Sequence, residues 1–166
     1  EEDVEGLFTF SASAISTWNM CHRKFGYSYI AGIKSESNAS AALGTKIHGE
    51  LENWLTKKQV PALAPAKRLL PILPTPMHPG MLIEHGFRLL FPQGVARGFL
   101  DLLVLQPELK RMPPGPWSPE RPFVHDHKST SNIAYAKTPE DLLTDPQAIL
   151  YGVEARKAAA YLRKVK

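Results

Sequence analysis

The sequence predicts an α/β fold, because helical patterns and strand-like runs alternate along one chain. Leucine and isoleucine recur every fourth residue between Leu43 and Leu55, which predicts an amphipathic helix over residues 40–57. Segments 82–91 and 95–105 are apolar and flank the turn signal Pro92-Gln93-Gly94, so they predict a hairpin. A second long helical pattern covers residues 147–160.

The remaining segments predict shorter elements and connections. Ser11 and Ser13 are candidate N-caps for a short helix near the start of the chain. Prolines concentrate in residues 60–80 and 106–122, where we expect connections with little regular structure. Residues 122–128 predict a further strand.

Aromatic residues gather just after the first predicted helix, at Phe25, Tyr27 and Tyr29, next to Arg23 and Lys24. Such a mixture could stack nucleobases and hold phosphates. Aromatic side chains more often serve burial first, so the favoured interpretation is that these three rings fill the edge of a core.

The bulk composition predicts one soluble globular domain over residues 1–166. The chain is 43% hydrophobic and 22% charged, an ordinary globular balance. Its net charge of +4 favours a polyanionic partner only weakly, since many basic proteins bind no nucleic acid.

The single cysteine, Cys21, excludes an intrachain disulfide and a four-cysteine metal site within this chain. A reducing compartment is therefore the default. No apolar run approaches the roughly 18 residues of a membrane span, and the acidic start is unlike a secretory signal. We expect an intracellular protein that does not enter a membrane. Because the chain lacks an initiator Met, the interpretation leaves open that it is a piece of something longer.

Two carboxylates interrupt apolar runs and stand out as candidate site residues. Asp101 lies inside a predicted buried strand, where an unpaired charge would cost several kcal/mol. A metal, or a salt bridge to Arg97 or Lys128, must therefore compensate it. Asp126 precedes Lys128 by two residues, and on a strand both side chains would project from the same face.

His48 lies one residue, about 100° of helix rotation, off the apolar stripe of the first long helix, and Glu52 follows one turn later. Taken alone, a histidine in such a place is more often structural than a metal ligand.

These residue types suit phosphodiester hydrolysis. Carboxylate oxygens are hard ligands that Mg²⁺ prefers, and a bound cation can acidify water and stabilise charge on the phosphate. A lysine beside that water would add electrostatic stabilisation. An imidazole ligand is tolerated more readily by Mn²⁺ than by Mg²⁺.

Four spaced motifs then add up to a resemblance. Their order resembles the RecB-type branch of the PD-(D/E)XK nuclease superfamily, and so does the opening Ser11-x-Ser13-x-Ile15 followed by Cys21-His22-Arg23-Lys24-Phe25. The four motifs are Gly44-x-x-x-His48, Gly98-x-x-Asp101, Asp126-x-Lys128 and Gln147-x-x-x-Tyr151.

The resemblance implies a restriction-endonuclease-like core, with a central mixed sheet flanked by helices. It also implies roles for individual residues. Asp101, Asp126 and Lys128 would be catalytic; His48, Asp101, Asp126 and the backbone carbonyl of His127 would bind one or two Mg²⁺ or Mn²⁺ ions; Gln147 and Tyr151 would contact the nucleic acid or brace the site.

Some relatives hold an iron-sulfur cluster through one early and three late cysteines. Cys21 lies at the early position, but no partner follows it, so no cluster is expected from this chain. The chain ends soon after the Gln147-x-x-x-Tyr151 helix, which leaves open a nuclease domain short of its C-terminal end.

The resemblance therefore predicts a Mg²⁺- or Mn²⁺-dependent deoxyribonuclease, with an exonuclease of recombination or repair as the first choice. DNA is the expected partner, and a helicase or recombinase is a further candidate partner. The alternatives are an endonuclease or structure-specific nuclease, and a nucleic-acid-binding module that kept the fold and lost catalysis. The least favoured alternative is a basic globular domain with chance motifs.

Overall fold

The computed structural model describes residues 6–33, 39–105, 122–128, 134 and 136–165, and two compact units form within it. Three elements, β2, β3 and α6, contribute residues to both units. Unit 1 comprises residues 1–37, 86–99 and 137–154; unit 2 comprises residues 38–85, 100–136 and 155–166. The prediction of a single domain stays a prediction.

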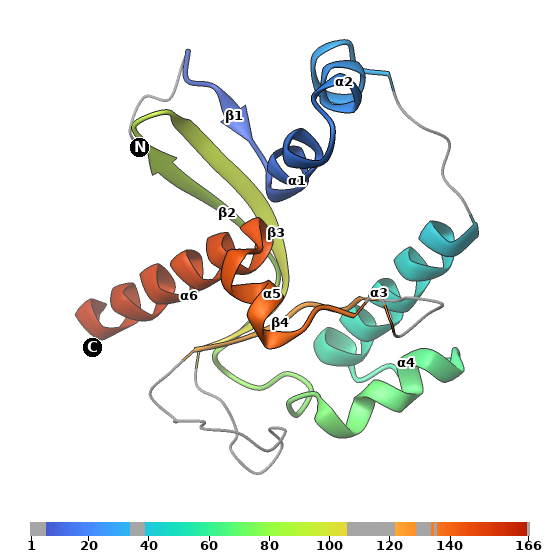
Figure 1. Cartoon of the computed structure of the whole chain (residues 1–166). Helices are drawn as coiled ribbons and strands as arrows, with labels where there is room; N and C mark the ends of the chain where they lie inside the picture. The colour runs from blue at the N-terminus through green and yellow to red at the C-terminus, as the bar shows by residue number, and fades with distance from the viewer. Residues whose placement is uncertain (1–5, 34–38, 106–121, 129–133, 135, 166) are drawn as a thin grey trace. The chain divides into compact units, whose positions relative to one another are not determined.

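A mixed sheet flanked by helices is the central feature of the fold, as the sequence predicts (Figure 1). Strand β3 pairs with β2, with β1 in parallel orientation and with β4 in antiparallel orientation. The predicted hairpin is confirmed, with its turn at Pro92-Gln93. The strands are β1 (Thr9–Phe10), β2 (Met81–Phe91), β3 (Gly94–Val104) and β4 (Phe123–His125).

Strand β4 is shorter than predicted. Its register pairs Leu102 with His125, and it ends there, one residue before Asp126. The expectation that Asp126 and Lys128 lie within a strand is therefore wrong. One further step of the register would set Asp126 opposite Asp101, and like charges directly opposite each other destabilise a strand pair.

Unit 1 begins with β1 and two short helices, α1 (Ala12–Met20) and α2 (His22–Phe25), followed by the single π-helical turn η1 (Gly26–Ile30). The predicted cap is confirmed, because the Ser11 hydroxyl accepts from the backbone N–H of Ala14 at 3.2 Å. The sulfur of Cys21 caps α2 in the same way.

The favoured interpretation of the early aromatic residues is wrong. Tyr27 and Tyr29 are 49% and 43% exposed, and Phe25 is only partly buried. A core edge would have removed these rings from water. The structure instead leaves them on the surface of unit 1.

In unit 1 a helix also packs against the sheet. Helix α6 (Pro146–Val165) confirms the predicted C-terminal helix, and it follows α5 (Pro139–Thr144). The Tyr151 ring meets the Phe87 ring edge-on, with their centroids 6.0 Å apart. Gly98 lets Phe87 approach, since a Cβ at that position would lie 2.8 Å from the Phe87 ring. The glycine of the Gly98-x-x-Asp101 motif thus has a packing role.

Unit 2 is built on α3 (Ala39–Lys57), which confirms the predicted amphipathic helix. Its stripe is buried from Ile47 onwards, whereas Leu43 is 45% exposed. Helix α4 (Ala64–Leu69) and the 3-10 turn η2 (Leu70–Ile72) provide the little regular structure expected in the proline-rich stretch. The core of unit 2 consists of Ile47, Leu51, Leu55, Ala66, Leu73, Leu102 and Val104.

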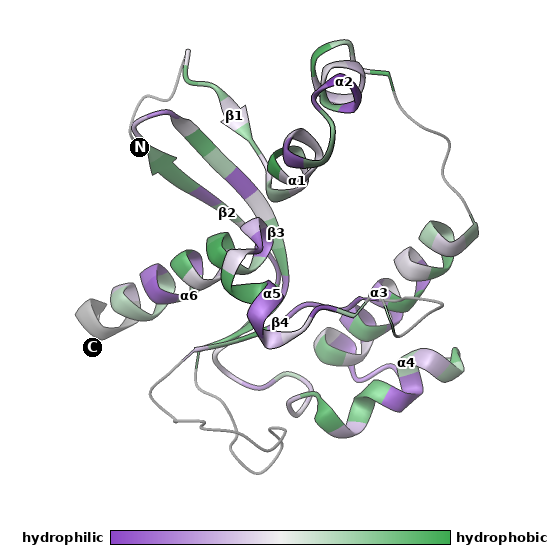
Figure 2. Cartoon of the chain, viewed as in Figure 1, coloured by the Kyte–Doolittle hydropathy of each residue, from purple (hydrophilic) through white to green (hydrophobic). Residues whose placement is uncertain are grey.

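Figure 2 shows hydrophobic residues interspersed with hydrophilic ones along α3 and α4, as packing on one side of each helix requires. No helix in the described part of the chain is long and apolar enough to cross a membrane. The connection predicted for residues 106–122 lies outside the described residues, except for Pro122.

Candidate metal centre

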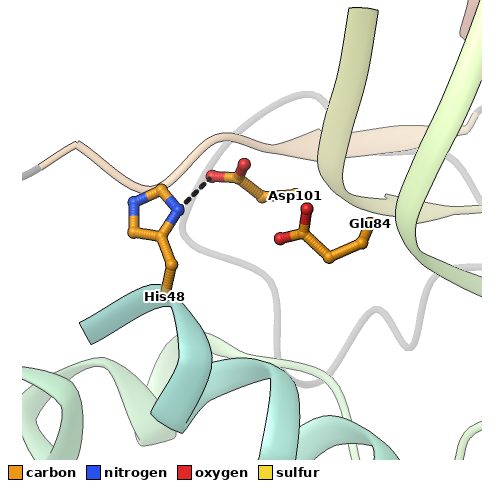
Figure 3. A group of neighbouring side chains, drawn as sticks. All are labelled: His48, Glu84 and Asp101. Carbon is orange, nitrogen blue, oxygen red and sulfur yellow. Dashed lines mark ion pairs between the residues drawn. The ribbon is translucent and has the colours of Figure 1, made fainter. Parts of the chain in front are cut away.

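Three side chains of unit 2 converge on one point (Figure 3). His48 comes from α3, Glu84 from β2 and Asp101 from β3. One ligand atom from each lies within 4.8 Å of the others. An imidazole nitrogen and two carboxylate oxygens at such separations form a donor set suited to a divalent cation.

Asp101 is held by its neighbours in unit 2 and is the most enclosed of the three. It lies between Leu100 and Leu102, both fully buried, and its side chain is 14% exposed. Its Oδ2 accepts a hydrogen bond from the backbone N–H of His127 at 2.6 Å and lies 3.6 Å from Nδ1 of His48. The cost of burying this carboxylate is thus offset in part by a backbone donor.

The His48 ring has distinct partners on its two nitrogens. Nε2 lies 2.5 Å from the backbone carbonyl oxygen of His127. A carbonyl oxygen only accepts, so Nε2 carries the proton in this hydrogen bond, and neutral His48 then has its lone pair on Nδ1. That lone pair faces the Asp101 carboxylate, and a cation between the two groups would resolve their repulsion.

Glu84 is held in an unusual backbone conformation. Its φ of 47° lies in the left-handed region, where a non-glycine residue is strained. Such strain on the order of 1–3 kcal/mol concentrates at functional sites. The pKa of the Glu84 carboxyl is raised, first by partial burial and then by the negative charges of Asp101 and Glu52, although His48 opposes the shift.

The electrostatics of the site and its donor atoms both favour a bound divalent cation. Two carboxylates within 4.8 Å of each other repel, which is part of why the pKa of Glu84 is raised. A divalent cation among these atoms would remove that repulsion and would use the Nδ1 lone pair. The residues present therefore fit the metal ion that the sequence predicts.

A cavity of about 530 Å³ opens beside these residues. Small residues of α3, among them Gly44, Thr45 and Gly49, line one side and leave room there. Gly44 of the Gly44-x-x-x-His48 motif thus shapes the cavity. The other lining residues are Ala41, His48, Glu52, Glu84, His127 and Lys128.

Asp126 and Lys128 pair with each other. The Lys128 ammonium lies 3.0 Å from Asp126 Oδ2, and the lysine side chain is 63% exposed. The two side chains therefore meet although neither residue is in a strand. Asp126 is outside the group of three ligands found among the described residues. Its predicted role as a ligand stays a prediction, as does that of the His127 carbonyl.

Two further histidines flank the centre on β4 and just after it. Burial lowers the pKa of His125 to about 4, with a smaller contribution from His127. Burial also lowers the pKa of His127, while Asp101 opposes the shift. Both rings are therefore neutral near pH 7, so they add no positive charge beside the centre.

Gln147 and Tyr151 lie in unit 1, one turn apart on α6. The Gln147 Nε2 donates to the Tyr151 hydroxyl at 2.6 Å, and that hydroxyl donates to the carbonyl of Phe99 at 2.7 Å. These bonds brace the start of α6 against β3 within unit 1. Contact of either side chain with nucleic acid stays a prediction.

Sequence reasoning missed Glu84. A signal for it was available, because counting outwards from a two-residue turn at Pro92-Gln93 sets Glu84 opposite Asp101. Two carboxylates opposite each other on paired strands predict a bound cation. A salt bridge from Lys128 was one of the alternatives for compensating Asp101; the Lys128 ammonium instead pairs with Asp126.

Comparison with known proteins supports the nuclease prediction over part of the chain. The family model of the PD-(D/E)XK nuclease superfamily matches residues 9–75. No curated protein and no solved structure matches the chain. The matched range contains His48, whereas Asp101, Asp126 and Lys128 lie beyond it.

The family match and the geometry of the candidate metal centre rest largely on different residues, and both support a metal-dependent enzyme. The superfamily consists of nucleases that use divalent metal ions. Both carboxylates of the candidate centre lie outside the matched range; the sequence had singled out Asp101, and the structure added Glu84. The superfamily match implies a metal-dependent nuclease, which is a hydrolase, and the mixed sheet flanked by helices is consistent with the restriction-endonuclease-like fold of that superfamily.

Proposed function

We propose that this chain is a Mg²⁺- or Mn²⁺-dependent deoxyribonuclease of the RecB-like branch. The observation that carries the proposal is the convergence of His48, Glu84 and Asp101 beside a cavity that Lys128 also lines. A cation site alone would fit many proteins. The exposed ammonium group of Lys128 at the same cavity would supply the positive charge that a phosphodiester substrate requires.

We assign metal binding and charge stabilisation to different residues of the chain. Asp101 and Glu84 provide hard oxygen ligands, and His48 provides one nitrogen, held by the His127 carbonyl. When bound, a divalent cation supplies Lewis-acid stabilisation of the phosphate and makes water nucleophilic near neutral pH. Lys128, tethered by Asp126, would orient that water or stabilise the developing charge.

The presence of an imidazole in the donor set favours Mn²⁺ at least as much as Mg²⁺. A site made of oxygen ligands alone would lack this preference for Mn²⁺. The order of the four motifs supports the RecB-like branch, for which an exonuclease of recombination or repair is the first choice. We propose DNA as the substrate, a helicase or recombinase as a partner, and an intracellular location.

The test is cleavage of labelled DNA, linear and closed circular, by the purified chain with Mg²⁺, Mn²⁺ or EDTA. The proposal expects degradation with either metal and none with EDTA. Loss of linear DNA with closed circles intact would support an exonuclease, and opened circles would support the endonuclease alternative. Activity that persists in EDTA would overturn the metal mechanism.

A metal-binding measurement separates an inactive binding module from a nuclease. Calorimetry should show Mn²⁺ binding to the wild type, weakened at least about 10-fold by His48→Ala. Lys57→Ala, an exposed lysine at the end of the same helix, is the control and should bind Mn²⁺ as the wild type does. DNA binding without metal binding or cleavage would favour the inactive module.

A further inference from the structure

The surface of unit 1 carries a run of rings that the metal centre does not use. We call Trp18, His22, Phe25, Tyr27 and Tyr29 the aromatic ladder. The ladder extends over α1, α2 and η1, whose hydrophobic and hydrophilic residues are mixed in Figure 2. Every residue from Trp18 to Lys24 and from Tyr27 to Ile33 is exposed.

Four rings of the ladder contact one another, and the fifth, Tyr27, contacts Arg23. Trp18 stacks on His22 with centroids 4.0 Å apart, and it meets Phe25 edge-on at 5.2 Å. Phe25 in turn stacks on Tyr29 at 5.2 Å. Such contacts hold exposed rings in place, so little side-chain entropy would be lost when a ligand binds.

The ladder continues from α2 onto η1. A π-helical turn follows α2 directly and carries both tyrosines. Single π-turns inside helical segments are rare and frequently mark functional sites. On this turn Tyr29 stacks on Phe25, whereas the Tyr27 hydroxyl accepts a hydrogen bond from Arg23.

Positive charge accompanies the rings. The Arg23 guanidinium donates to the Tyr27 hydroxyl through Nε and Nη2, at 3.2 Å each, and its Cζ lies 5.6 Å from the centre of that ring. Lys24 is exposed beside it. Residues 6–35 contain no aspartate or glutamate, so the segment that carries the ladder has no negative side chain of its own.

We propose that the aromatic ladder binds single-stranded nucleic acid, with bases stacked on Trp18 and Tyr29 and phosphates held by Arg23 and Lys24. Exposed flat rings with adjacent cations are the combination that binds unstacked bases without sequence preference. In a duplex the bases are stacked on each other and unavailable to these rings. This inference rests on the proposed function, which gives DNA as the ligand. It adds that the DNA bound by the ladder is single-stranded.

The rival occupant is a second copy of this chain, because Met20 and Ile30 are 76% and 72% exposed nearby. The positive charge of this surface argues against a second copy. A second copy would bring its own Arg23 and Lys24 to the same surface, and like charges would meet without an acidic partner in residues 6–35. A polyanion has the complementary charge.

The experiment measures binding in EDTA, so that cleavage plays no part. Fluorescence anisotropy with a labelled strand of roughly 15 nucleotides, and with the matching duplex, should show preference for the single strand. Trp18→Ala should weaken single-strand binding by about 10-fold, the loss expected for one stacked base. Trp18→Phe should retain most of the affinity. Tyr161→Ala, which removes a 68% exposed ring on α6, should change little.

A pair of charge variants provides a matched control that does not touch the rings. Replacing both Arg23 and Lys24 by alanine should lower the slope of log affinity against log salt by about 1.4, for two phosphate contacts on a single strand. Replacing Lys67 and Arg68, an exposed basic pair on α4, removes the same charge and should leave the slope unchanged.

The outcomes separate this proposal from the proposed function. If Trp18→Ala binds like Tyr161→Ala, or both charge pairs act alike, the ladder proposal is wrong whether or not DNA is cleaved. If Trp18→Ala leaves DNA affinity intact but abolishes dimers in sedimentation, the surface joins two copies and the proposal is likewise wrong. Ladder-dependent binding without cleavage would overturn only the nuclease proposal.

Discussion

The metal centre of unit 2 and the aromatic ladder of unit 1 are assembled in opposite ways. The centre takes one side chain each from α3, β2 and β3, so its three ligands are separated by up to 53 positions, from His48 to Asp101. The ladder comes from residues 18–29, a single contiguous segment. A site of the first kind depends on the tertiary fold, and a surface of the second kind depends mainly on local helical structure.

This difference has a chemical counterpart. The centre brings together the carboxylates of the enclosed Asp101 and the more exposed Glu84, and the pKa of Glu84 is raised by partial desolvation and by the negative charges of Asp101 and Glu52. The ladder is exposed and has only positive charges among residues 6–35. If one handles the cation and the other the polyanion, their variants must give different phenotypes.

The largest effect is expected from Asp101→Asn. This change keeps the shape of the side chain but removes the charge of the most enclosed ligand, so cleavage should fall by about 10³-fold or more. Binding of single-stranded DNA in EDTA should stay within a few-fold of the wild type. A parallel loss of both in gel-based cleavage and anisotropy assays would mean that the two regions do not divide the work as proposed.

Lys128→Ala tests the cation that lines the cavity. Loss of this ammonium should lower the cleavage rate by about 10²-fold to 10³-fold, because it acts on charge in the transition state. Affinity for DNA should change only a few-fold, since Lys128 is 63% exposed and is one of many cations. The exposed Lys57 is the control. An equal loss of affinity would make Lys128 a phosphate contact.

The buried histidine on β4 predicts a dependence of stability on pH. The pKa of His125 is about 4 in the folded chain, below its ordinary 6.5. The unfolded chain therefore binds a proton first as the pH falls below 6.5, and stability present above that pH is lost towards pH 4. Between pH 7 and pH 5 the loss should be about 2 kcal/mol in urea unfolding.

His125→Phe should remove most of that pH dependence. The ring at this position packs edge-on against Phe123 at 4.3 Å, so an aromatic replacement preserves the contact. Unchanged pH profiles in the variant would show that another group, for example His127, whose pKa burial also lowers, is responsible.

The smallest effect is expected from Glu84→Gln without metal. Because the pKa of Glu84 is raised above 4.5, the unfolded chain loses its proton first, so this group makes folding less favourable as the pH rises through 4.5. The glutamine variant should then melt at a higher temperature at pH 7, by at most about 3 °C, and the gain should vanish at pH 4. It should also lose the stabilisation that Mn²⁺ gives the wild type. A lower melting temperature in EDTA would contradict this account.

The sequence by itself determined the elements whose signals are local. The N-cap of α1, the apolar spacing of α3 and the turn between β2 and β3 are set by residues a few positions apart, and each prediction was confirmed. The sequence also singled out His48, Asp101 and Lys128. In the structure His48 and Lys128 line one cavity, and Asp101 belongs to the same group of candidate metal ligands as His48.

Only the tertiary structure decided which groups meet. Glu84 joined the centre because the folded chain brings its carboxylate within 4.8 Å of ligand atoms of Asp101 and His48. Strand β4 ended before Asp126, so that His127 donates its N–H to Asp101 and Lys128 pairs with Asp126. Exposure was equally beyond the sequence, because the composition of the aromatic ladder is the same whether its rings are buried or not. Burial depends on what packs against a segment, and that is a property of distant residues.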